Sequence, residues 1–190
     1  MSTPATTVFP FRYALGNAIR DIVVDTVVPA FNAGLQTYLS GASNIPVFAD
    51  ADVIYGNKLE VKTPVICVYV QHDTNSHIAM QTDMSQWYVN VCLKVPFVAA
   101  NEPEAYNTVG DCFLDNTRAA FVSPNVYNLT PKNANGNLVL PGVNAYTNTY
   151  FCEGLGPLPK RDSANQLTYW EWMAVIKSQI SLAFDRGTTF

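Results

Sequence analysis

The sequence predicts an α+β protein with a single domain, in which two helices pack on one face of a mainly antiparallel sheet. The length of 190 residues suits one domain with its own hydrophobic core. The spacing of the hydrophobic residues changes along the chain from a helix to two strands, then to a second helix and two more strands. This order of elements is the basis of the predicted fold class. The expected elements are helices at 13–40 and 102–122 and strands at 64–72, 86–98, 143–155 and 166–184.

The first helix is expected to follow a flexible N-terminal arm. Residues 1–10 are rich in Thr and Pro, and the domain is expected to span residues 11–190. Across residues 13–40, apolar side chains recur at helical spacing and Asn, Asp and Gln occupy the other face, which predicts an amphipathic helix. Pro29 removes a backbone donor from this helix, so we expect a kink or a break between Asp25 and Pro29.

The first pair of strands is expected to enclose a long polar loop. Residues 65–70 are apolar on both alternating faces, which is typical of a strand in the middle of a sheet. Residues 87–95 alternate between apolar and polar side chains, which predicts a strand with one buried face. Residues 71–85 between them are longer than a tight turn requires and therefore indicate a function. Two further short strands are expected around Val47 and at residues 59–61.

The second helix carries a start signal in the sequence. Asn101 and Glu104 have the spacing of a capping box, and Pro103 lies in the first turn, where its missing donor costs nothing. Residues 124–142 are rich in Asn, Pro and Gly, and we expect an exposed excursion made of turns. Residues 166–176 hold β-branched and aromatic side chains, which predict a strand.

Composition excludes some classes of protein. The net charge is −4, and the charged fraction of 14% lies below the roughly 25% of ordinary soluble domains. No basic cluster exceeds the pair Lys160-Arg161, so a dedicated nucleic-acid binder is not expected. The N-terminus lacks a secretion signal and no apolar run is long enough to span a membrane, so we expect a soluble protein made in the cytoplasm. The four cysteines are expected to be buried free thiols.

No catalytic, cofactor-binding or metal-binding site is expected. His72 and His77 are the only histidines, and a polar loop does not hold them with Asp73 and Asp83 at the fixed spacing that a metal requires. The pairs Asp50 with Asp52 and Glu102 with Glu104 show no apolar environment that would separate their pKa values. The sequence contains no nucleotide-binding glycine motif and no nucleophile elbow.

Two groups of residues are candidates for contacts with other proteins. The first is the polar loop at 71–85, whose side chains can stay solvated until a partner arrives. The second is the face of the last strand that carries two tryptophans, which either packs in the core or forms an interface. The candidate interface residues are Gln71, His72, Asp73, Thr74, Asn75, His77, Asp83, Trp170 and Trp172.

The order of these elements resembles the tail terminator family of long-tailed bacteriophages. The resemblance covers roughly residues 11–184. It rests on the long first helix, the central pair of strands at 65–70 and 87–95, the helix entered through Asn101-Glu-Pro-Glu104, and the final strand that begins Leu167-Thr-Tyr-Trp-Glu-Trp. The segments at 42–63 and 124–142 are longer than in the small members of the family.

The resemblance implies a structural virion protein rather than an enzyme. Such a protein forms a hexameric ring with copies of itself, caps the tail tube, stops its polymerisation and joins it to the head connector. Its partners would be the tail tube protein and the head–tail connector protein, with DNA only passing through the lumen, no cofactor and no membrane. Another neck or minor tail protein, of the connector or stopper type, and a small-ligand-binding module remain alternatives.

Overall fold

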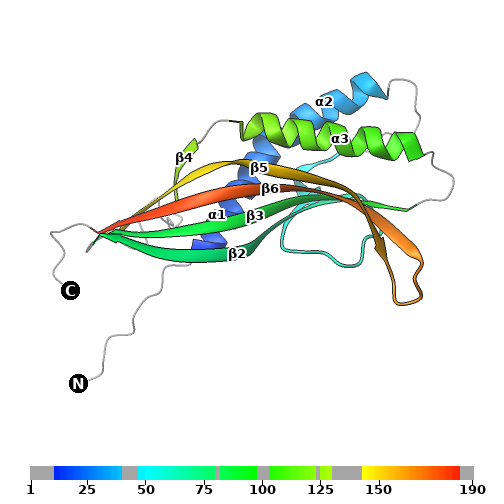
Figure 1. Ribbon diagram of the computed structural model, residues 1–190. Helices are drawn as coiled ribbons and strands as arrows, with labels where there is room; N and C mark the ends of the chain where they lie inside the picture. Colours follow the sequence, from blue (N-terminus) through cyan, green and yellow to red (C-terminus); the bar gives the residue numbers. More distant parts are fainter. Residues whose placement is uncertain are drawn as a thin grey trace.

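The computed structural model describes residues 11–39, 47–79, 82–97, 103–122, 125–129 and 143–184. They form one domain in which helices cover one face of a six-stranded sheet, as Figure 1 shows. The strand order is β1-β2-β3-β6-β5-β4, and every neighbouring pair is antiparallel except β1 with β2. The predicted α+β class, with helices on one face of a mainly antiparallel sheet, is therefore confirmed. The N-terminal arm at residues 1–10 lies outside the described residues.

The N-terminal helical segment changes its winding where the sequence predicted a break. Helix α1 (Phe11–Ile22) continues into the π-helical turn η1 (Val23–Val27) and then into α2 (Val28–Tyr38). The backbone N–H of Val28 donates to the carbonyl of Val23, which is the wider spacing of a π turn. Since Pro29 follows at the start of α2, its missing donor falls where the regular helical bonding is already interrupted.

The first pair of long strands, β2 and β3, is longer than the sequence predicted. Strand β2 spans Val65–Ala79 and β3 spans Thr82–Pro96, so most of the predicted loop at 71–85 is paired strand. The prediction of a long loop is wrong. The backbone ladder continues through polar residues because β3 lies between β2 and β6 and is paired on both sides from Thr82 to Lys94.

The segment before β2 also differs from the prediction. The short strand is β1 (Val53–Tyr55), which follows the 3₁₀ turn η2 (Asp50–Asp52) and pairs in parallel with β2. No strand forms at Val47 or Leu59, whose side chains are 69% and 76% exposed. The β-branched and aromatic side chains of Val53-Ile54-Tyr55 favour an extended strand beside β2.

The second half of the chain follows the prediction more closely. Helix α3 spans Pro103–Ala120, and the last two strands are β5 (Val143–Arg161) and β6 (Leu167–Phe184). The excursion expected to contain only turns includes the short strand β4 (Asn125–Asn128), which pairs with β5. Asn101 and residues 130–142 lie outside the described residues, so the capping box and the rest of that excursion stay predictions.

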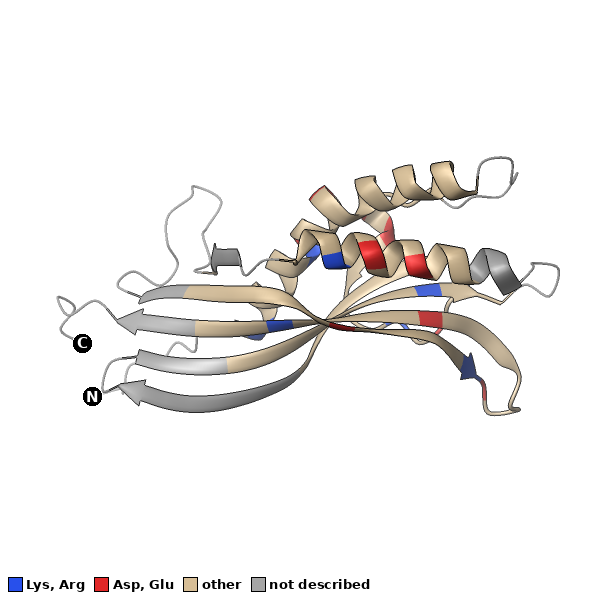
Figure 2. Cartoon of the chain, turned by 45° about the horizontal axis from the view of Figure 1, so that its top comes forward, with Lys and Arg blue, Asp and Glu red and all other residues tan. Residues whose placement is uncertain are grey.

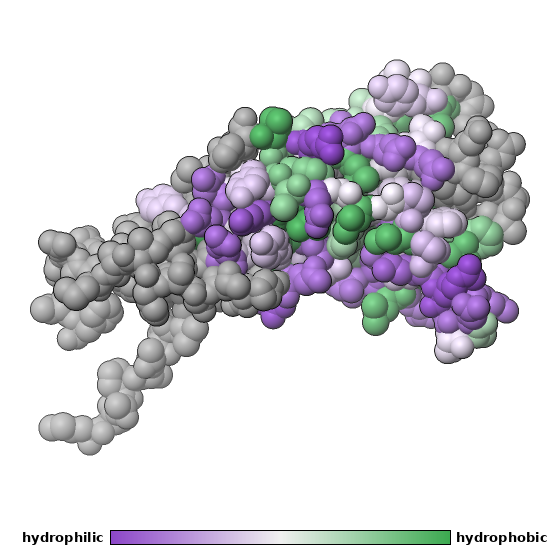
Figure 3. Space-filling view, in the orientation of Figure 1, coloured by the Kyte–Doolittle hydropathy of each residue, from purple (hydrophilic) through white to green (hydrophobic). Residues whose placement is uncertain are grey.

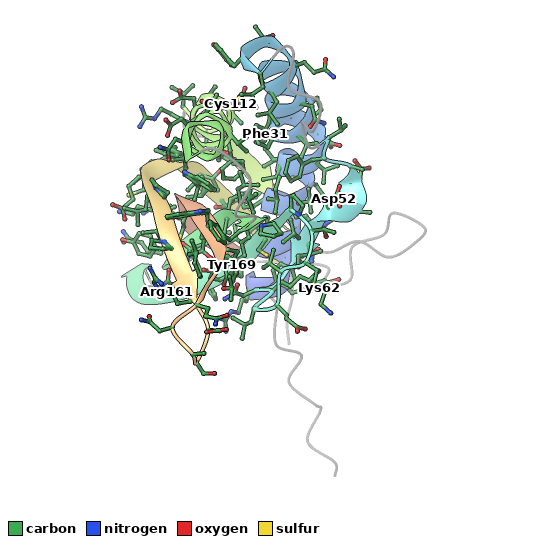
Figure 4. All side chains as sticks on the ribbon, turned by 90° about the vertical axis from the view of Figure 1, so that its right-hand side faces the viewer. Phe31, Asp52, Lys62, Cys112, Arg161 and Tyr169 are labelled. Atoms are coloured by element: carbon green, nitrogen blue, oxygen red, sulfur yellow. The ribbon has the colours of Figure 1, made fainter. Side chains whose placement is uncertain are left out.

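The main core lies between the helices and the sheet. Fully buried side chains of α1, η1 and α2 meet buried side chains of β2, β3 and β6, and the ring of Phe31 contacts Phe113 of α3 at 5.7 Å between centroids. Gly110 lets α3 approach β6 closely, because a Cβ at this position would overlap the indole of Trp172. Figure 4 shows Phe31 and Cys112 side by side where α2 and α3 meet. None of the described helices is long and apolar enough to cross a membrane.

Candidate functional site

The face of the sheet that the helices leave uncovered carries tyrosines and amides. Strand alternation sends Val89 and Ile176 into the core beneath the helices, so their neighbours Asn90 and Lys177 point to the other face. We call this surface the open face. Its residues, given by the strand register, are Tyr69, Gln86, Tyr88, Asn90, Tyr146, Asn148, Tyr150, Glu153, Val175, Lys177 and Gln179.

One end of the uncovered side is closed by the segment between β1 and β2, at residues 56–64. Val61 packs there on a small second core that contains Val65, Cys67 and Cys92. In Figure 4, Tyr169 lies on this side of the sheet, between Arg161 in the β5–β6 hairpin and Lys62 in the segment. The open face is therefore the remaining, unclosed part of the same side.

A buried charge cluster holds that segment in place. The Nζ of Lys94 donates to Asn57 Oδ1 at 2.6 Å and to the carbonyl of Lys58 at 2.7 Å, and it lies 3.3 Å from Glu171 Oε2. Lys160 reaches the other carboxylate oxygen, Oε1, at 3.2 Å. The side chain of Lys94 is 1% exposed, and the same ammonium lies 5.2 Å from the ring centroid of Tyr169. We refer to Lys94, Glu171 and Lys160 as the charge cluster.

This cluster is suited to anchoring rather than to catalysis. An ammonium group has three donors, and Lys94 has an acceptor for each of them. A lysine whose three protons are all held by acceptors has no proton or lone pair to offer a substrate. The cluster instead joins four separate parts of the chain, namely β3, β5, β6 and the segment at 56–64.

Two thiols lie next to the charge cluster, directly opposite each other on β2 and β3. Burial raises the pKa of Cys67 and raises the pKa of Cys92 to about 12. Burial also raises the pKa of Tyr69, whose hydroxyl lies 3.8 Å from the sulfur of Cys92. These groups stay protonated at neutral pH and are poor nucleophiles. Cys152 on β5 is exposed, which corrects the expectation that all four thiols are buried.

The predicted contact residues at 71–85 lie along two paired strands. The register sets Asp73 opposite Trp87 and His77 opposite Asp83. Gln71 is exposed, and its Oε1 accepts a 2.6 Å hydrogen bond from Asn90 Nδ2 at the edge of the open face. The side chains of His72, Asp73, Thr74, Asn75, His77 and Asp83 lie outside the described residues, and a contact role for them stays a prediction.

The tryptophan face of β6 is part of the core. Trp172 is fully buried under α3, and Trp170 is half-buried against the same core. Of the two interpretations of this face, core packing is confirmed, and the prediction that Trp172 forms an interface is wrong. The reason is strand alternation, because Trp172 lies on the same face of β6 as Ala174 and Ile176, beneath the helices.

A groove between α2 and α3 is the described surface feature nearest to a ligand pocket. It has a volume of about 460 Å³ and is lined by Gly34, Tyr38, Thr108, Asp111, Cys112, Asp115 and Asn116. Burial raises the pKa of the Cys112 thiol, which contacts Asn116 Nδ2 at 3.4 Å. Within the described ranges, no group of three His, Cys, Asp or Glu side chains is placed to hold a metal ion.

Sequence reasoning missed the charge cluster. Lys94 occupies a polar position in an alternating strand, which normally indicates a solvated side chain. The signal that could have found it is Glu171, a single acid between two tryptophans, which needs a partner if its strand lies in mid-sheet. Pairing the two residues requires the β3–β6 register, which the sequence does not supply.

Comparison with known proteins assigns no function to the chain, so the evidence for a function comes from the structure. No protein-family model matches the chain, and no curated protein matches it in sequence. The case for a function therefore depends on the open face, the charge cluster and the order of the elements.

Proposed function

We propose that this chain is a structural virion protein of a long-tailed bacteriophage, located in the tail or neck. In this proposal it assembles with copies of itself into a ring, most simply a hexamer, that caps the tail tube and stops its polymerisation. The ring joins the tail tube protein to the head–tail connector protein, and DNA only passes through its lumen. No step of this function needs a catalytic residue or a cofactor.

The open face is the observation that carries the proposal. Its side chains are mainly tyrosines and amides, and the charged residues that the register places on it are Lys177 and Glu153. Protein interfaces are enriched in tyrosine and depleted in lysine and glutamate, since a tyrosine buries a large ring and keeps one polar end. Tyr146 is 40% exposed and therefore has surface left to bury against another protein.

The distribution of charge supports the same proposal. Figure 2 shows acidic residues along α3, whereas the middle of the sheet carries few charged side chains. Glu171, one of the few acids on the strands, is already neutralised by Lys94 and Lys160. A face with few charges has a lower desolvation cost when a second protein covers it than a highly charged face has.

The experiment that tests the proposal measures assembly directly. The purified chain is examined by native mass spectrometry and by negative-stain electron microscopy, alone and mixed with a tail tube protein of a long-tailed bacteriophage. We expect closed rings and shorter tubes when the chain is added during tube polymerisation. A chain that stays monomeric and leaves the length of the tubes unchanged would refute the proposal.

The groove between α2 and α3 favours one alternative, a small-ligand-binding module. Its volume lies in the range of ligand pockets, which is roughly 300–1,000 Å³. Its lining is mainly polar and includes Asp111 and Asp115, whereas ligand pockets are mostly apolar with a few polar groups. A connector or stopper protein at the neck is the other alternative, and it would show rings that bind the connector but leave tube growth unaffected.

A further inference from the structure

Three sulfur-containing side chains form one row across the uncovered side of the sheet. The register sets Cys67 of β2 opposite Cys92 of β3, and it sets Cys92 opposite Met173 of β6. Directly opposite residues of neighbouring strands project from the same face of a sheet. All three side chains pack in the small second core, where both thiols are fully buried and the thioether is partly buried. We call Cys67, Cys92 and Met173 the sulfur row.

Backbone hydrogen bonds set the spacing of the sulfur row. The carbonyl of Val68 accepts from the N–H of Gly56 at 2.8 Å, so the backbone groups of residue 68 face β1. Because successive residues of a strand alternate, those of Cys67 face β3, and Cys67 and Cys92 are a hydrogen-bonded pair. Cys92 and Met173 are then a non-hydrogen-bonded pair. The Cα atoms of these two kinds of pair lie about 5.5 Å and about 4.5 Å apart, respectively.

This spacing suits a shared metal ion better than a disulfide bond. The Cβ atoms of directly opposite residues are about 4.5–5.5 Å apart, and those of a hydrogen-bonded pair lie at the upper end of this range. A disulfide needs about 3.8 Å between the two Cβ atoms, so Cys67 and Cys92 would have to approach each other to form one. A metal held by two thiolates at about 2.3 Å each allows their sulfurs to lie up to about 4.6 Å apart. The two thiols can therefore hold one ion with their strands in place.

We propose that the sulfur row binds one Cu(I) ion, with Cys67 and Cys92 as thiolate ligands and Met173 as a thioether ligand. Thiolate and thioether sulfurs are soft ligands, and they select Cu(I) over the hard cations that prefer oxygen. The segment at 56–64 closes this end of the sheet, and its Val61 packs on the same core. The ion is therefore shielded from water by apolar side chains.

The charge cluster beside the sulfur row compensates the charge of the bound ion. Each thiol releases its proton to solvent on binding, so two thiolates and one monovalent cation leave one negative charge in excess. Lys94 and Lys160 share the single acid Glu171, which leaves the cluster with one positive charge in excess. Burial raises the pKa of both thiols, and the ammonium of Lys94 acts on both in the opposite direction. The cluster therefore favours the thiolate form that the metal requires.

Titration with Cu(I) tests the site. The protein is titrated without oxygen in a Cys152→Ser background, which removes the exposed thiol, and copper is supplied as its coloured complex with bicinchoninate. We expect one Cu(I) per chain. Cys67→Ser should lower the affinity at least about a hundredfold, because even residues that only hydrogen-bond to a metal ligand are worth roughly 10–100-fold. Cys112→Ser, which removes a buried thiol on α3, is the matched control and should leave the affinity unchanged. Equal copper binding in the Cys67 and Cys112 variants, or none in the starting protein, would overturn the proposal.

X-ray absorption at the copper edge identifies the ligands, and it keeps the test valid if the Cys67 variant fails to fold. Met173→Leu conserves the volume of the side chain and should therefore retain the fold. We expect three sulfur ligands in the starting protein and two in the Met173 variant. Addition of Cu(I) should also raise the urea midpoint less in this variant, because the ion binds its folded state more weakly. The same number of sulfur ligands in both proteins, or ligation by nitrogen and oxygen, would overturn the site.

Discussion

At the scale of single residues, the buried ammonium of Lys94 determines how the segment at 56–64 is held on the sheet. Glu171 supplies the compensating charge, and the carbonyl of Lys58 supplies a neutral acceptor. Lys160 contacts the same carboxylate, but its side chain is 40% exposed. Two cations therefore share one acid in very different solvent environments, which allows the effect of burial to be measured within one cluster.

The first prediction compares these two cations. Lys94→Met should lower the free energy of unfolding by about 3 kcal/mol, because it leaves Glu171 with one partner and the carbonyl of Lys58 without its donor. Lys160→Ala is the matched control and should cost less than about 1 kcal/mol, since water screens an exposed pair. Urea denaturation measures both. Equal costs would mean that burial does not decide the strength of the pair.

A double variant extends this prediction. Lys94→Met combined with Glu171→Leu removes both buried charges, so its cost should be smaller than the sum of the two single costs. Additive costs would show that Lys94 and Glu171 do not interact in the folded protein.

The second prediction concerns the thiols. Cys152 should react with iodoacetamide in the native protein at pH 8, whereas Cys67, Cys92 and Cys112 should react only after unfolding, because burial keeps them protonated and inaccessible. Mass spectrometry of the labelled protein counts the modified sites. A Cys152→Ser variant should take up no label in the folded state, and label in that variant would contradict the buried positions.

The same thiols set a pH dependence of stability. The pKa of Cys92 is about 12 in the folded protein against an ordinary value of 9.0, so the folded state retains a proton that the unfolded state has lost between these values. The stabilisation is complete below pH 9.0 and is lost as the pH rises towards 12. Urea midpoints of the wild type should fall more steeply over this range than those of a Cys92→Ala variant.

At the scale of elements, the contact of α3 with β6 depends on the absence of one side chain. Gly110 faces the indole of Trp172, and a Cβ there would overlap the ring. The ring cannot move aside easily, because Trp172 is fully buried between α3 and the sheet.

The third prediction tests this contact. Gly110→Ala should destabilise the fold by about 2 kcal/mol through overpacking, although alanine is the better helix former. Asn107→Ala, at an exposed position of the same helix, is the matched control and should change stability by no more than about 0.5 kcal/mol. Thermal unfolding measures both variants. A stabilising effect of Gly110→Ala would mean that helix propensity outweighs the overlap.

The individual helices and strands differ in how well the sequence predicts them. Helical spacing located α3 and the N-terminal helices, and apolar alternation located the middle of β2, β3 and β6, because these segments bury one face against the core. The outer half of the β2–β3 pair was missed, since its residues are polar and only the neighbouring strands stabilise them. Strand β1 was misplaced because three residues give too short a pattern to detect. The open face was not predicted, since it requires the register of four strands.

At the scale of the whole molecule, helices cover one side of the sheet, the other side carries the open face, and the β5–β6 hairpin projects at one end. The β5–β6 hairpin bends away from the helices in Figure 1, and Figure 3 shows hydrophilic residues gathered at its tip. The turn there is held by Asp162, whose Oδ1 accepts from the backbone N–H of Ala164 and of Gln166, each at 2.9 Å. The ordered polar tip and the open face are two different surfaces on one subunit, as a head-to-tail ring requires.

The fourth prediction tests the open face as the assembly surface. Tyr146→Arg should abolish oligomers in native mass spectrometry without changing the urea midpoint of the monomer, because it adds a charge where the proposed neighbour packs. Tyr38→Arg is the control on the helical layer, where the side chain is 72% exposed. It should assemble normally. Loss of assembly only in the Tyr38 variant would move the contact to the groove between α2 and α3.

The place of β6 in the sheet has a consequence for the order in which the molecule can fold. It is the last of the described strands in sequence, yet it lies at the centre of the sheet, between β3 and β5. During synthesis, the strands on its two sides can form only separate ribbons, because no described strand joins them until β6 has emerged. Closing the β3–β6 ladder brings together segments far apart in sequence, which makes folding slow. Until that moment the inner edges of β3 and β5 are both unpaired, and the nascent chain stays exposed to aggregation until β6 has emerged.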